Sequence, residues 1–453
     1  MIRCLLFMCG CMASTLYAFV PTAYVCNSAN GTVSSVAVVE SPMLPVGSHP
    51  SAIALTPDQS TLCVCNTSAD TVSIIDIATG GTQTVTVGSP PTAIAITPDG
   101  TKACVCNSAG NSVSVIDLSS LSVTNISLTG QPISITILSD GSSAFVSCDN
   151  TEVVVFNPVT SSIITTISMA DTLGPITTTP DGLKVCLACD AGLRIINPHT
   201  YAVTVVSLSE PTHKIAITPD STQACLLGTN RLFVVDLTTL ATQSEFVGNT
   251  ASDLAITKDS SQILVSQSFP SGVETFTLNP LTSGDLFSFG RNNQAIAITS
   301  DGKQACIVDP RSGLEPGTLW IFDILTHSIS GQMLGVQPNA LVISSPVAPN
   351  APAKFIGKIK RYSHKKRTLC LHWKNSSSQD IVTYEIFAFK KKIATILPNA
   401  QSKYHQPIYS PFLFCQKIPK KYFHRLHKKY RIRAVSSNGL ASAFTLLRFS
   451  HCK

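Results

Sequence analysis

The chain has 453 residues, of which 44% are apolar and 13% are charged, and its formal net charge is +6. This composition excludes broad intrinsic disorder, and the length exceeds that of one ordinary domain. The charge is unevenly distributed. Residues 351–453 contain 22 Lys and Arg and two acidic residues, whereas residues 1–350 contain 10 Lys and Arg and 24 acidic residues. The sequence therefore predicts an acidic domain followed by a smaller basic one.

Residues 1–18 have the pattern of a secretory signal peptide. Arg3 supplies a positive charge, Cys4–Leu16 form an apolar stretch, and Ala18 is a small residue suited to cleavage. The stretch is too short for a membrane span, and polar sequence follows it. Acylation of Cys9 or Cys11 is an alternative that the neighbouring residues fit poorly. We expect an exported protein, in the periplasm or at the cell surface of a bacterium.

Residues 19–346 repeat one phrase seven times, an alternating apolar strand followed by Thr-Pro-Asp-Gly or a variant of it. The aspartates of this phrase recur every 39–42 residues and are Asp58, Asp99, Asp140, Asp181, Asp220, Asp259 and Asp301. Such a period, with four short strands per unit, predicts an all-β fold, a β-propeller with four-stranded blades. Residues 24–40 and 339–345 supply an eighth, split blade, although divergence near residues 272–286 also permits seven.

The repeated carboxylates are interpreted as structural, because a catalytic residue does not recur in every repeat. The prolines of the phrase suit the first corner of a type I turn, and the following aspartate can accept backbone amide bonds. A second series is expected to close the third strand of each blade in the same way. It consists of Asp76, Asp117, Asn157, Asn197, Asp236 and Asp323.

Ten cysteines fall in the repeats, most of them on the second strand of a blade. Cys63 and Cys65 are two residues apart on a strand, and their side chains therefore point to one face in a geometry unsuited to a disulfide. Cys186 and Cys189 are placed on opposite faces, unlike a redox pair. We interpret the cysteines as small apolar fillers between blades, and we expect no metal and no cofactor.

The repeat also carries a family resemblance. Tyr24-Val25-Cys26-Asn27 and Val64-Cys65-Asn66 begin a pattern that continues through Thr-Val-Ser and Ile-Asp to Thr-Pro-Asp-Gly. This pattern resembles the YVTN-type propeller repeat of microbial surface-layer and secreted proteins, with Cys in place of the usual Thr. The resemblance covers about residues 20–348 and implies the fold. Its members include surface scaffolds, binding proteins and relatives of lactone-hydrolysing propellers, so it does not identify an activity.

A linker is predicted at residues 347–353, and a basic domain at residues 354–453. Leu369, Leu371 and Trp373 alternate on one predicted strand, and Tyr430, Ile432 and Ala434 alternate on another. Short strands with a buried Trp indicate an immunoglobulin-like β-sandwich. The segment resembles a fibronectin type III domain, in which Trp373 matches the core Trp and Leu426 with Tyr430 matches the tyrosine corner.

The basic domain is predicted to bind an anionic polymer, glycan or surface, because dense cations attract polyanions. Docking onto the acidic propeller or onto other proteins is the alternative explanation of its charge. The candidate contact residues are Lys365, Lys366, Arg367, Lys420, Lys421, Arg425, Lys428, Lys429, Arg431 and Arg433.

No catalytic motif stands out in the sequence, and the glutamates of the propeller share no common register. We therefore expect an exported, non-enzymatic scaffold that mediates binding or adhesion. Two alternatives remain: a lactonase-like hydrolase or lyase that uses the propeller mouth, which requires carboxylates from several blades to converge there, and a purely structural envelope component.

Overall fold

The computed structural model describes residues 22–36, 43–247, 251–268, 270–299, 301–310 and 315–344, and the backbone of the strands between residues 354 and 449. The chain divides into two units, one spanning Pro21–Ser345 and the other containing Pro346–Lys453. The predicted signal peptide (1–18) and linker (347–353) lie outside the described residues. In the part that is described, no helix has the length and apolar character needed to span a bilayer.

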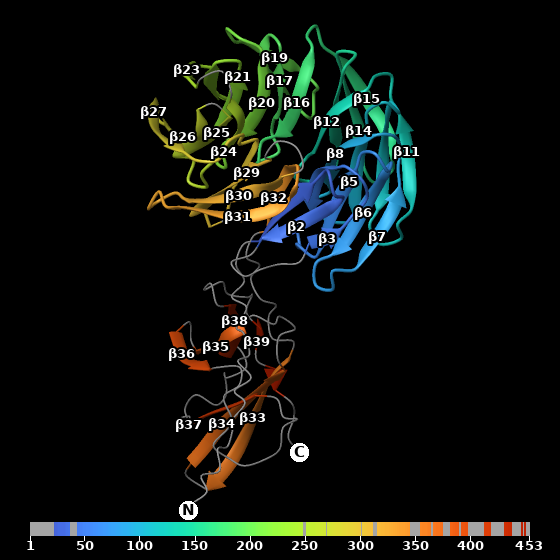
Figure 1. Cartoon of the computed structure of the whole chain (residues 1–453). Helices are drawn as coiled ribbons and strands as arrows, with labels where there is room; N and C mark the ends of the chain where they lie inside the picture. The colour runs from blue at the N-terminus through green and yellow to red at the C-terminus, as the bar shows by residue number, and fades with distance from the viewer. Residues whose placement is uncertain are drawn as a thin grey trace, which may run out of the picture. The chain divides into compact units, whose positions relative to one another are not determined.

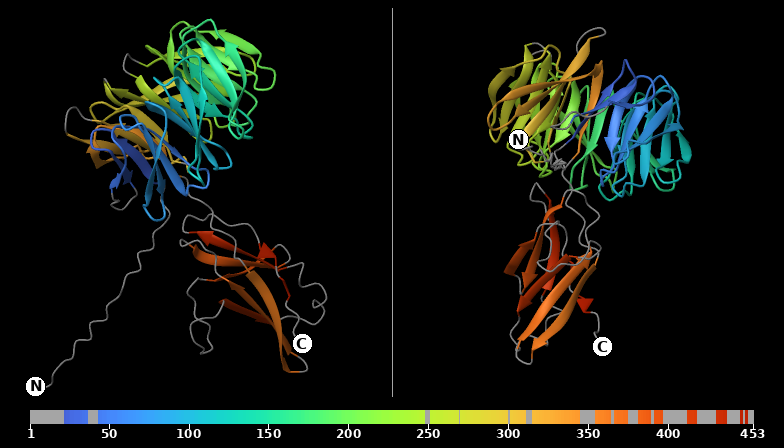
Figure 2. Two further views of the ribbon diagram at one scale, coloured as in Figure 1. Left: turned by 90° about the vertical axis from the view of Figure 1, so that its right-hand side faces the viewer. Right: turned by 60° about the horizontal axis from the view of Figure 1, so that its bottom comes forward.

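The first unit is an eight-bladed propeller in which every blade is a four-stranded antiparallel sheet (Figures 1 and 2). The inner strands are β4 (Pro50–Leu55), β8 (Pro91–Ile96), β12 (Pro132–Ile137), β16 (Leu173–Thr178), β20 (Thr212–Ile217), β24 (Ala251–Ile256), β28 (Ala295–Ile298) and β32 (Pro338–Ile343). We number the blades 1 to 8 in this order. Each inner strand is followed outward by a second, a third and an outer strand.

The second strands, from blade 1 to blade 8, are β5 (Thr61–Asn66), β9 (Lys102–Asn107), β13 (Ala144–Cys148), β17 (Val185–Cys189), β21 (Gln223–Gly228), β25 (Gln262–Ser268), β29 (Gln304–Asp309) and β1 (Ala23–Asn27). The third strands are β6 (Thr71–Asp76), β10 (Ser112–Asp117), β14 (Glu152–Asn157), β18 (Gly192–Ile196), β22 (Arg231–Asp236), β26 (Ser271–Leu278), β30 (Pro316–Asp323) and β2 (Thr32–Val36). The outer strands are β7 (Thr82–Thr86), β11 (Val123–Ser127), β15 (Ser162–Ser168), β19 (Val203–Ser207), β23 (Thr242–Phe246), β27 (Leu281–Ser288), β31 (Ile329–Val336) and β3 (Met43–Pro45).

Blade 8 joins the two ends of the propeller, as the sequence predicts. Its inner strand β32 comes from the end of the unit and pairs with β1 from the beginning, with Val25 opposite Leu341. In Figure 1 this is the place where the blue first strands meet the orange last one. Neighbouring inner strands are in contact all the way round, including β32 with β4. The eight-blade count is thus confirmed, and the seven-blade alternative is wrong.

The hydrophobic core consists of eight layers, each packed between two neighbouring blades. One layer joins blades 2 and 3 through Cys106, Val115, Val146 and Phe156, all of which are buried. The second strands are buried along almost their whole length, as in TLCVCN and AFVSC, because a blade lies against each of their faces. The outer strands alternate or are largely exposed. Stability therefore depends on contacts between blades as much as within them.

A buried asparagine and a close-packed glycine repeat at one end of several blades. Asn107 ends β9 and is fully buried, and the Nδ2 group donates to the carbonyl oxygen of Gly88 at 3.1 Å once the amide is oriented by its hydrogen bonds. A Cβ on Gly88 would lie 2.6 Å from the side chain of Asn107. Gly47 meets Asn66 and Gly335 meets Asn27 in the same way. The asparagine of the repeat thus fixes the loop that leads from one blade to the next.

The strands of the second unit pair into two four-stranded sheets. The first has the order β37 (Phe412–Lys417), β34 (Lys366–Lys374), β33 (Lys354–Ser363) and β40 (Arg448–Phe449). The second has the order β36 (Lys391–Ile396), β35 (Ile381–Ala388), β38 (Tyr430–Ser436) and β39 (Thr445–Leu446). Trp373 lies on β34 and Tyr430 begins β38. The fibronectin type III sandwich and its buried Trp stay predictions.

Candidate functional site

The predicted basic residues fall in the second unit, where only strands are described. Lys366 and Arg367 lie on β34, and Arg431 and Arg433 lie on β38. These two strands belong to different sheets, so the structure does not bring the four residues into one sheet. The remaining candidates lie outside the described residues; they are Lys365, Lys420, Lys421, Arg425, Lys428 and Lys429.

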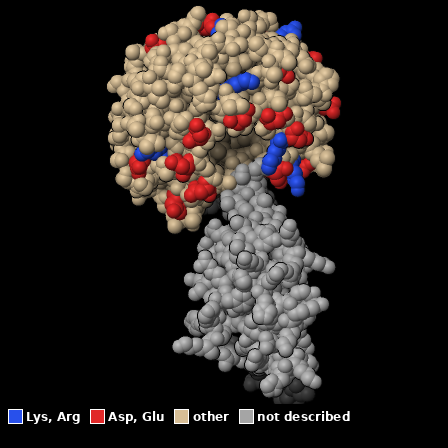
Figure 3. Space-filling model, turned by 180° about the vertical axis from the view of Figure 1, so that it is seen from behind, with Lys and Arg blue, Asp and Glu red and all other residues tan. Residues whose placement is uncertain are grey.

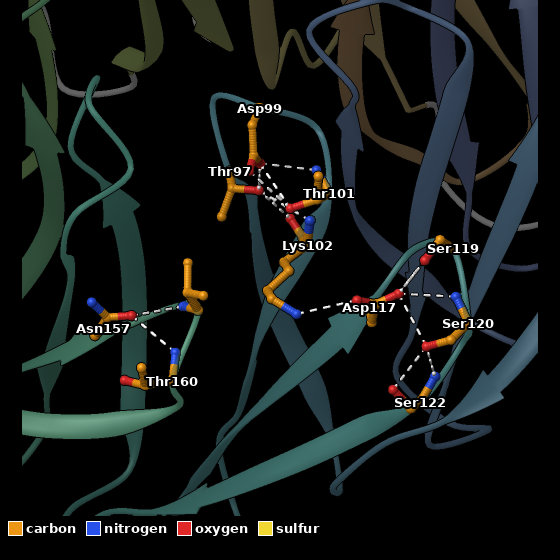
Figure 4. A network of polar contacts seen from close by, with 11 residues as sticks. Thr97, Asp99, Thr101, Lys102, Asp117, Ser119, Ser120, Ser122, Asn157 and Thr160 are labelled. Carbon is orange, nitrogen blue, oxygen red and sulfur yellow. Dashed lines mark hydrogen bonds and ion pairs between the residues drawn. The ribbon is translucent and has the colours of Figure 1, made fainter.

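The turn after each inner strand shows what the repeated aspartates do. In blade 2 the Thr97 hydroxyl donates to Asp99 Oδ1 at 2.6 Å, and the same carboxylate oxygen accepts the Thr101 amide at 3.0 Å (Figure 4). Thr97 Oγ1 also accepts the Lys102 amide at 3.0 Å. The aspartate therefore holds the turn closed from inside, which confirms the predicted amide bonds. Equivalent threonine–aspartate bonds occur at Asp58, Asp181, Asp220, Asp259 and Asp301.

These hydrogen bonds also hold the carboxylates in the ionised form. The hydroxyl of Thr97 and the amide of Thr101 lower the pKa of Asp99, because both donate to the charged state. The hydroxyls of Thr56 and Thr257 lower the pKa of Asp58 and Asp259 in the same way. A catalytic acid needs a pKa raised toward the working pH. These aspartates are instead fixed anions of the turns.

A second ring of turns closes the third strands, and the sequence predicted it correctly. Asp117 Oδ1 accepts the amides of Ser119 and Ser120, at 3.1 and 2.9 Å, and Oδ2 accepts from Lys102 Nζ at 3.2 Å (Figure 4). Asn157 caps the matching turn of blade 3 through the amides of Val159 and Thr160. The side-chain oxygen, rather than the charge, is what the turn requires.

Together the two series make one face of the propeller acidic. Inner strands of a propeller run parallel to one another around the channel, so the turns that follow them gather at one end. Figure 3 shows a face on which acidic side chains surround a central hollow, with few basic ones among them. The described turns contribute Asp58, Asp99, Asp140, Asp181, Asp220, Asp259, Asp301, Asp76, Asp117, Asp236 and Asp323, and the lysines near them are Lys102, Lys184, Lys258 and Lys303.

All ten propeller cysteines are free and buried, as the sequence predicts for apolar fillers. Cys63 and Cys65 pack in one layer between blades, whereas Cys186 and Cys189 pack in layers on opposite faces of blade 4. Burial raises the pKa of Cys104 to about 12, because a thiolate would lose its hydration there. None of these groups is poised as a nucleophile. Among the described residues, no group of three or more His, Cys, Asp or Glu could hold a metal ion.

The inner strands contain one feature that sequence reasoning missed. Lys214 on β20 and Asp253 on β24 occupy equivalent positions in neighbouring blades, with Nζ 3.6 Å from Oδ1. They are the only ionised side chains on the described inner strands. Asp253 Oδ2 also accepts the amide of Ile296 on β28, at 3.2 Å. One carboxylate thus connects three consecutive blades at the channel.

A signal for this pair exists in the sequence, at a single column of the aligned repeats. The positions equivalent to Lys214 and Asp253 in the other blades hold small or apolar residues, namely Ala52, Ala93, Ser134, Pro175, Ala295 and Ala340. Comparing the repeats column by column, rather than reading their shared pattern, would have found two charged residues in consecutive blades.

A β-bulge beside the pair directs His213 toward the next blade. The pairing of β20 with β21 shifts register between Thr212 and Lys214, and His213 is the extra residue. Its Nε2 lies 3.4 Å from the carbonyl oxygen of Ala251, so that nitrogen carries the proton. Ser51 and Asn339, at the same position in other blades, donate to the carbonyls of Pro91 and Pro50. His213 is thus one of several side chains that bridge neighbouring inner strands.

Comparison with known proteins supports the fold and leaves the activity open. A family model described as a domain of unknown function (DUF5074) matches residues 92–283, which correspond to blades 2 to 6. No curated protein matches the chain.

Two solved structures are similar to the chain. Dihydro-heme d1 dehydrogenase NirN, in complex with DHE, matches with a TM-score of 0.62 and 14% identity over 71% of this chain and 74% of that one. Hydrazine synthase of Kuenenia stuttgartiensis matches with a TM-score of 0.48 and 18% identity over 63% of this chain and 96% of that one. At such identities the likeness to the first shows a shared propeller fold and nothing about ligands or chemistry.

Proposed function

We propose that this chain is an exported, non-enzymatic binding protein of the bacterial periplasm or cell surface. The propeller is its rigid scaffold, and the basic segment 354–453 binds an anionic polymer, glycan or surface. The single observation that carries the proposal is the division of charge, with 22 Lys and Arg against two acids after residue 350. A segment of this charge density gains affinity for polyanions through release of their counterions.

The scaffold part of the proposal is supported by the polar groups of the propeller, which are occupied by hydrogen bonds or buried within the fold. Its repeated aspartates are occupied by turn hydroxyls and amides, as at Asp99 and Asp117. Its thiols are buried between blades. These groups stabilise the ring, and they are not held free for chemistry. Blade 8 closes the ring by pairing β1 with β32, so neither end of the propeller leaves an unfinished blade. The edges that remain are those of the short inner and outer strands of each blade, which limits the strand pairing that leads to aggregation and suits a protein that works outside the cell.

The binding role is tested with the full-length protein and three probes: heparin, double-stranded DNA, and vesicles of anionic phospholipid. The test variant replaces Lys420, Lys421, Lys428 and Lys429 with Gln, and its matched control replaces the same residues with Arg. We expect wild type and the Arg variant to bind at least one probe, with affinity that falls steeply as salt rises. For DNA, the slope of log affinity against log salt should decrease by about 3 to 4 in the Gln variant if all four lysines meet phosphates.

Two results would overturn this function. One is a wild-type protein that binds none of the three probes at about 50 mM salt, where counterion release is strongly favourable. The other is a Gln variant with the affinity and salt slope of wild type. Circular dichroism melts of all three proteins show whether a loss of binding reflects a loss of fold. Mass spectrometry of the mature N-terminus tests export separately, since cleavage near Ala18 is expected.

A further inference from the structure

Strand pairing in the second unit sets two cysteines directly opposite each other. Cys370 on β34 is the register partner of Cys415 on β37, within an antiparallel ladder that runs without a bulge from Thr368 to Trp373. Opposite residues in such a ladder have Cα atoms about 4.5 or 5.5 Å apart, depending on whether the pair exchanges backbone hydrogen bonds. Both spacings lie within the range of about 4.4–6.8 Å that a disulfide spans. The backbone therefore places the two residues where a disulfide can form.

The cysteines of the propeller are arranged differently. In the described ladders of that unit, each cysteine is opposite a residue of another kind, as Cys63 is opposite Ile74 on one side and Ala54 on the other. All ten are free and buried. A cross-strand pair of cysteines is thus a feature of the second unit, and it is not a consequence of the cysteine-rich repeat.

The position of the pair on its sheet also separates it from the propeller cysteines. Apart from Leu413, the large apolar residues of the ladder fall on one face, and they are Leu369, Leu371, Trp373, Phe412 and Phe414. Cys370 and Cys415 fall on the other face, together with Thr368, Lys417 and His372. The role of apolar filler, which fits the propeller cysteines, therefore does not explain this pair.

A bond at this position would close a loop that passes through the other sheet. Between Cys370 and Cys415 the chain forms β35 and β36, which belong to the second sheet of the unit, whereas β37 is an edge strand of the first. Closing a loop of this length removes conformational freedom from the unfolded chain and so favours the folded one. The segment has a particular need of such support, because its 22 Lys and Arg repel one another when the chain is compact.

We propose that Cys370 and Cys415 form a disulfide that fastens the edge strand β37 to β34. The proposal rests on the export proposed above, because structural disulfides persist in oxidising compartments. The oxidant is a thiol oxidase of that compartment in its disulfide form. The Cys370 thiolate attacks that disulfide and displaces one thiolate of the oxidase, and the Cys415 thiolate then attacks Cys370 Sγ and displaces the other. Two electrons and the two thiol protons pass to the oxidase, which leaves as a dithiol.

Peptide mapping tests the bond. The full chain is produced in a bacterial host with its N-terminal segment, alkylated with N-ethylmaleimide at lysis, and digested with trypsin without reductant. Trypsin places Cys370, Cys415 and Cys452 in separate peptides, namely 368–374, 404–417 and 449–453. We expect 368–374 linked to 404–417, and 449–453 alkylated. A link from either cysteine to 449–453 would overturn the proposal, and so would alkylation of both in a chain whose N-terminus has been cleaved.

A second measurement keeps the bond separate from export. Alkylation of both cysteines in a chain with an uncleaved N-terminus counts against export, and the purified, reduced protein is then equilibrated with reduced and oxidised glutathione. Formation of the link between 368–374 and 404–417 in this mixture supports the proposal without export. Two thiols that stay alkylatable there overturn it.

Scanning calorimetry tests what the bond does. Reduction with dithiothreitol should lower the melting temperature of the second unit by about 10 °C or more in wild type and in the matched control Cys452→Ser. It should not change that of the double variant Cys370→Ser, Cys415→Ser, which has no bond to lose. If reduction leaves the melting temperature of wild type unchanged, the bond does not fasten the unit. The comparison of oxidised with reduced wild type decides this point even where the double variant fails to fold.

Discussion

Thr97→Val is the substitution that best tests how much the hydrogen bonds of the turns contribute to the stability of a blade. Thr97 is 3% exposed, and Val has nearly the same shape, so the change removes a hydroxyl and little volume. Asp99 loses the 2.6 Å hydrogen bond, and the amide of Lys102 loses its 3.0 Å acceptor. Leaving this partly buried amide unpaired costs about 1–3 kcal/mol, which raises the equilibrium constant for opening of blade 2 about 5- to 150-fold.

The buried thiols of the same blade report this opening. Cys104 and Cys106 lie on β9, directly after the turn, and Cys306 lies on β29 in blade 7. Alkylation followed by mass spectrometry measures how fast each becomes accessible when closing is faster than labelling. We expect Thr97→Val to accelerate labelling of Cys104 and Cys106 and to leave Cys306 nearly unchanged.

The control for this prediction is Thr101→Val, which removes an exposed hydroxyl that also contacts Asp99, at 2.9 Å. Its effect should be within about 0.5 kcal/mol, since water replaces the lost bond. Labelling of Cys104 in Thr97→Val at the wild-type rate would refute the reasoning. Equal acceleration at Cys306 would show that the ring opens as a whole, and that the blade is not the unit of local unfolding.

Two further changes follow from the same contacts. Gly88→Ala should lower the melting temperature and reduce the free energy of unfolding by about 1–3 kcal/mol, because its Cβ would lie 2.6 Å from the buried side chain of Asn107. The control is Gly81→Ala, whose Cβ meets only the flexible side chain of Thr79, and it should change the melting temperature little. Stability should also decline below about pH 4, because hydrogen bonds lower the folded pKa of aspartates such as Asp99 below the unfolded value. Such groups stabilise the fold above the unfolded pKa and lose this contribution as the pH falls through the folded pKa. Melts from about pH 3 to 7 measure it, and a flat profile would contradict it.

The propeller could be predicted because each blade repeats the same pattern of strands and turns. Seven copies of one strand and turn make the period visible even where single copies diverge. Blade 3 has Leu138 in place of the turn threonine and still closes, with Asp140 accepting the amide of Ser142. Gly100 has a positive φ of 71°, and Gln59 and Ser221 adopt φ values of 60° and 64° at the same position. The bonds to the aspartate impose this conformation on residues that do not prefer it.

The channel pair could not be predicted in the same way, because it departs from the repeat. Lys214 and Asp253 are 39 residues apart, and they meet only because their blades are neighbours and their strands share a register. The shared pattern of the repeat identifies turns and core positions, which recur, whereas this pair lies where two copies differ from the others. The basic residues after position 354 could be identified from composition, but no repeat in that segment predicts which of them lie close together.

The acidic turns offer a way to separate the two explanations of the basic segment. Asn157 and Asn197 cap third-strand turns as Asp76, Asp236 and Asp323 do, so replacing these three aspartates with Asn should keep the turns and remove three negative charges. If the propeller competes with external polyanions for the basic segment, this variant should bind heparin more tightly at low salt. The difference should disappear above about 0.5 M salt, where charges farther apart than a few ångströms are screened. Equal binding by variant and wild type at every salt concentration would show that these acids do not compete, and that the basic segment serves an external partner alone.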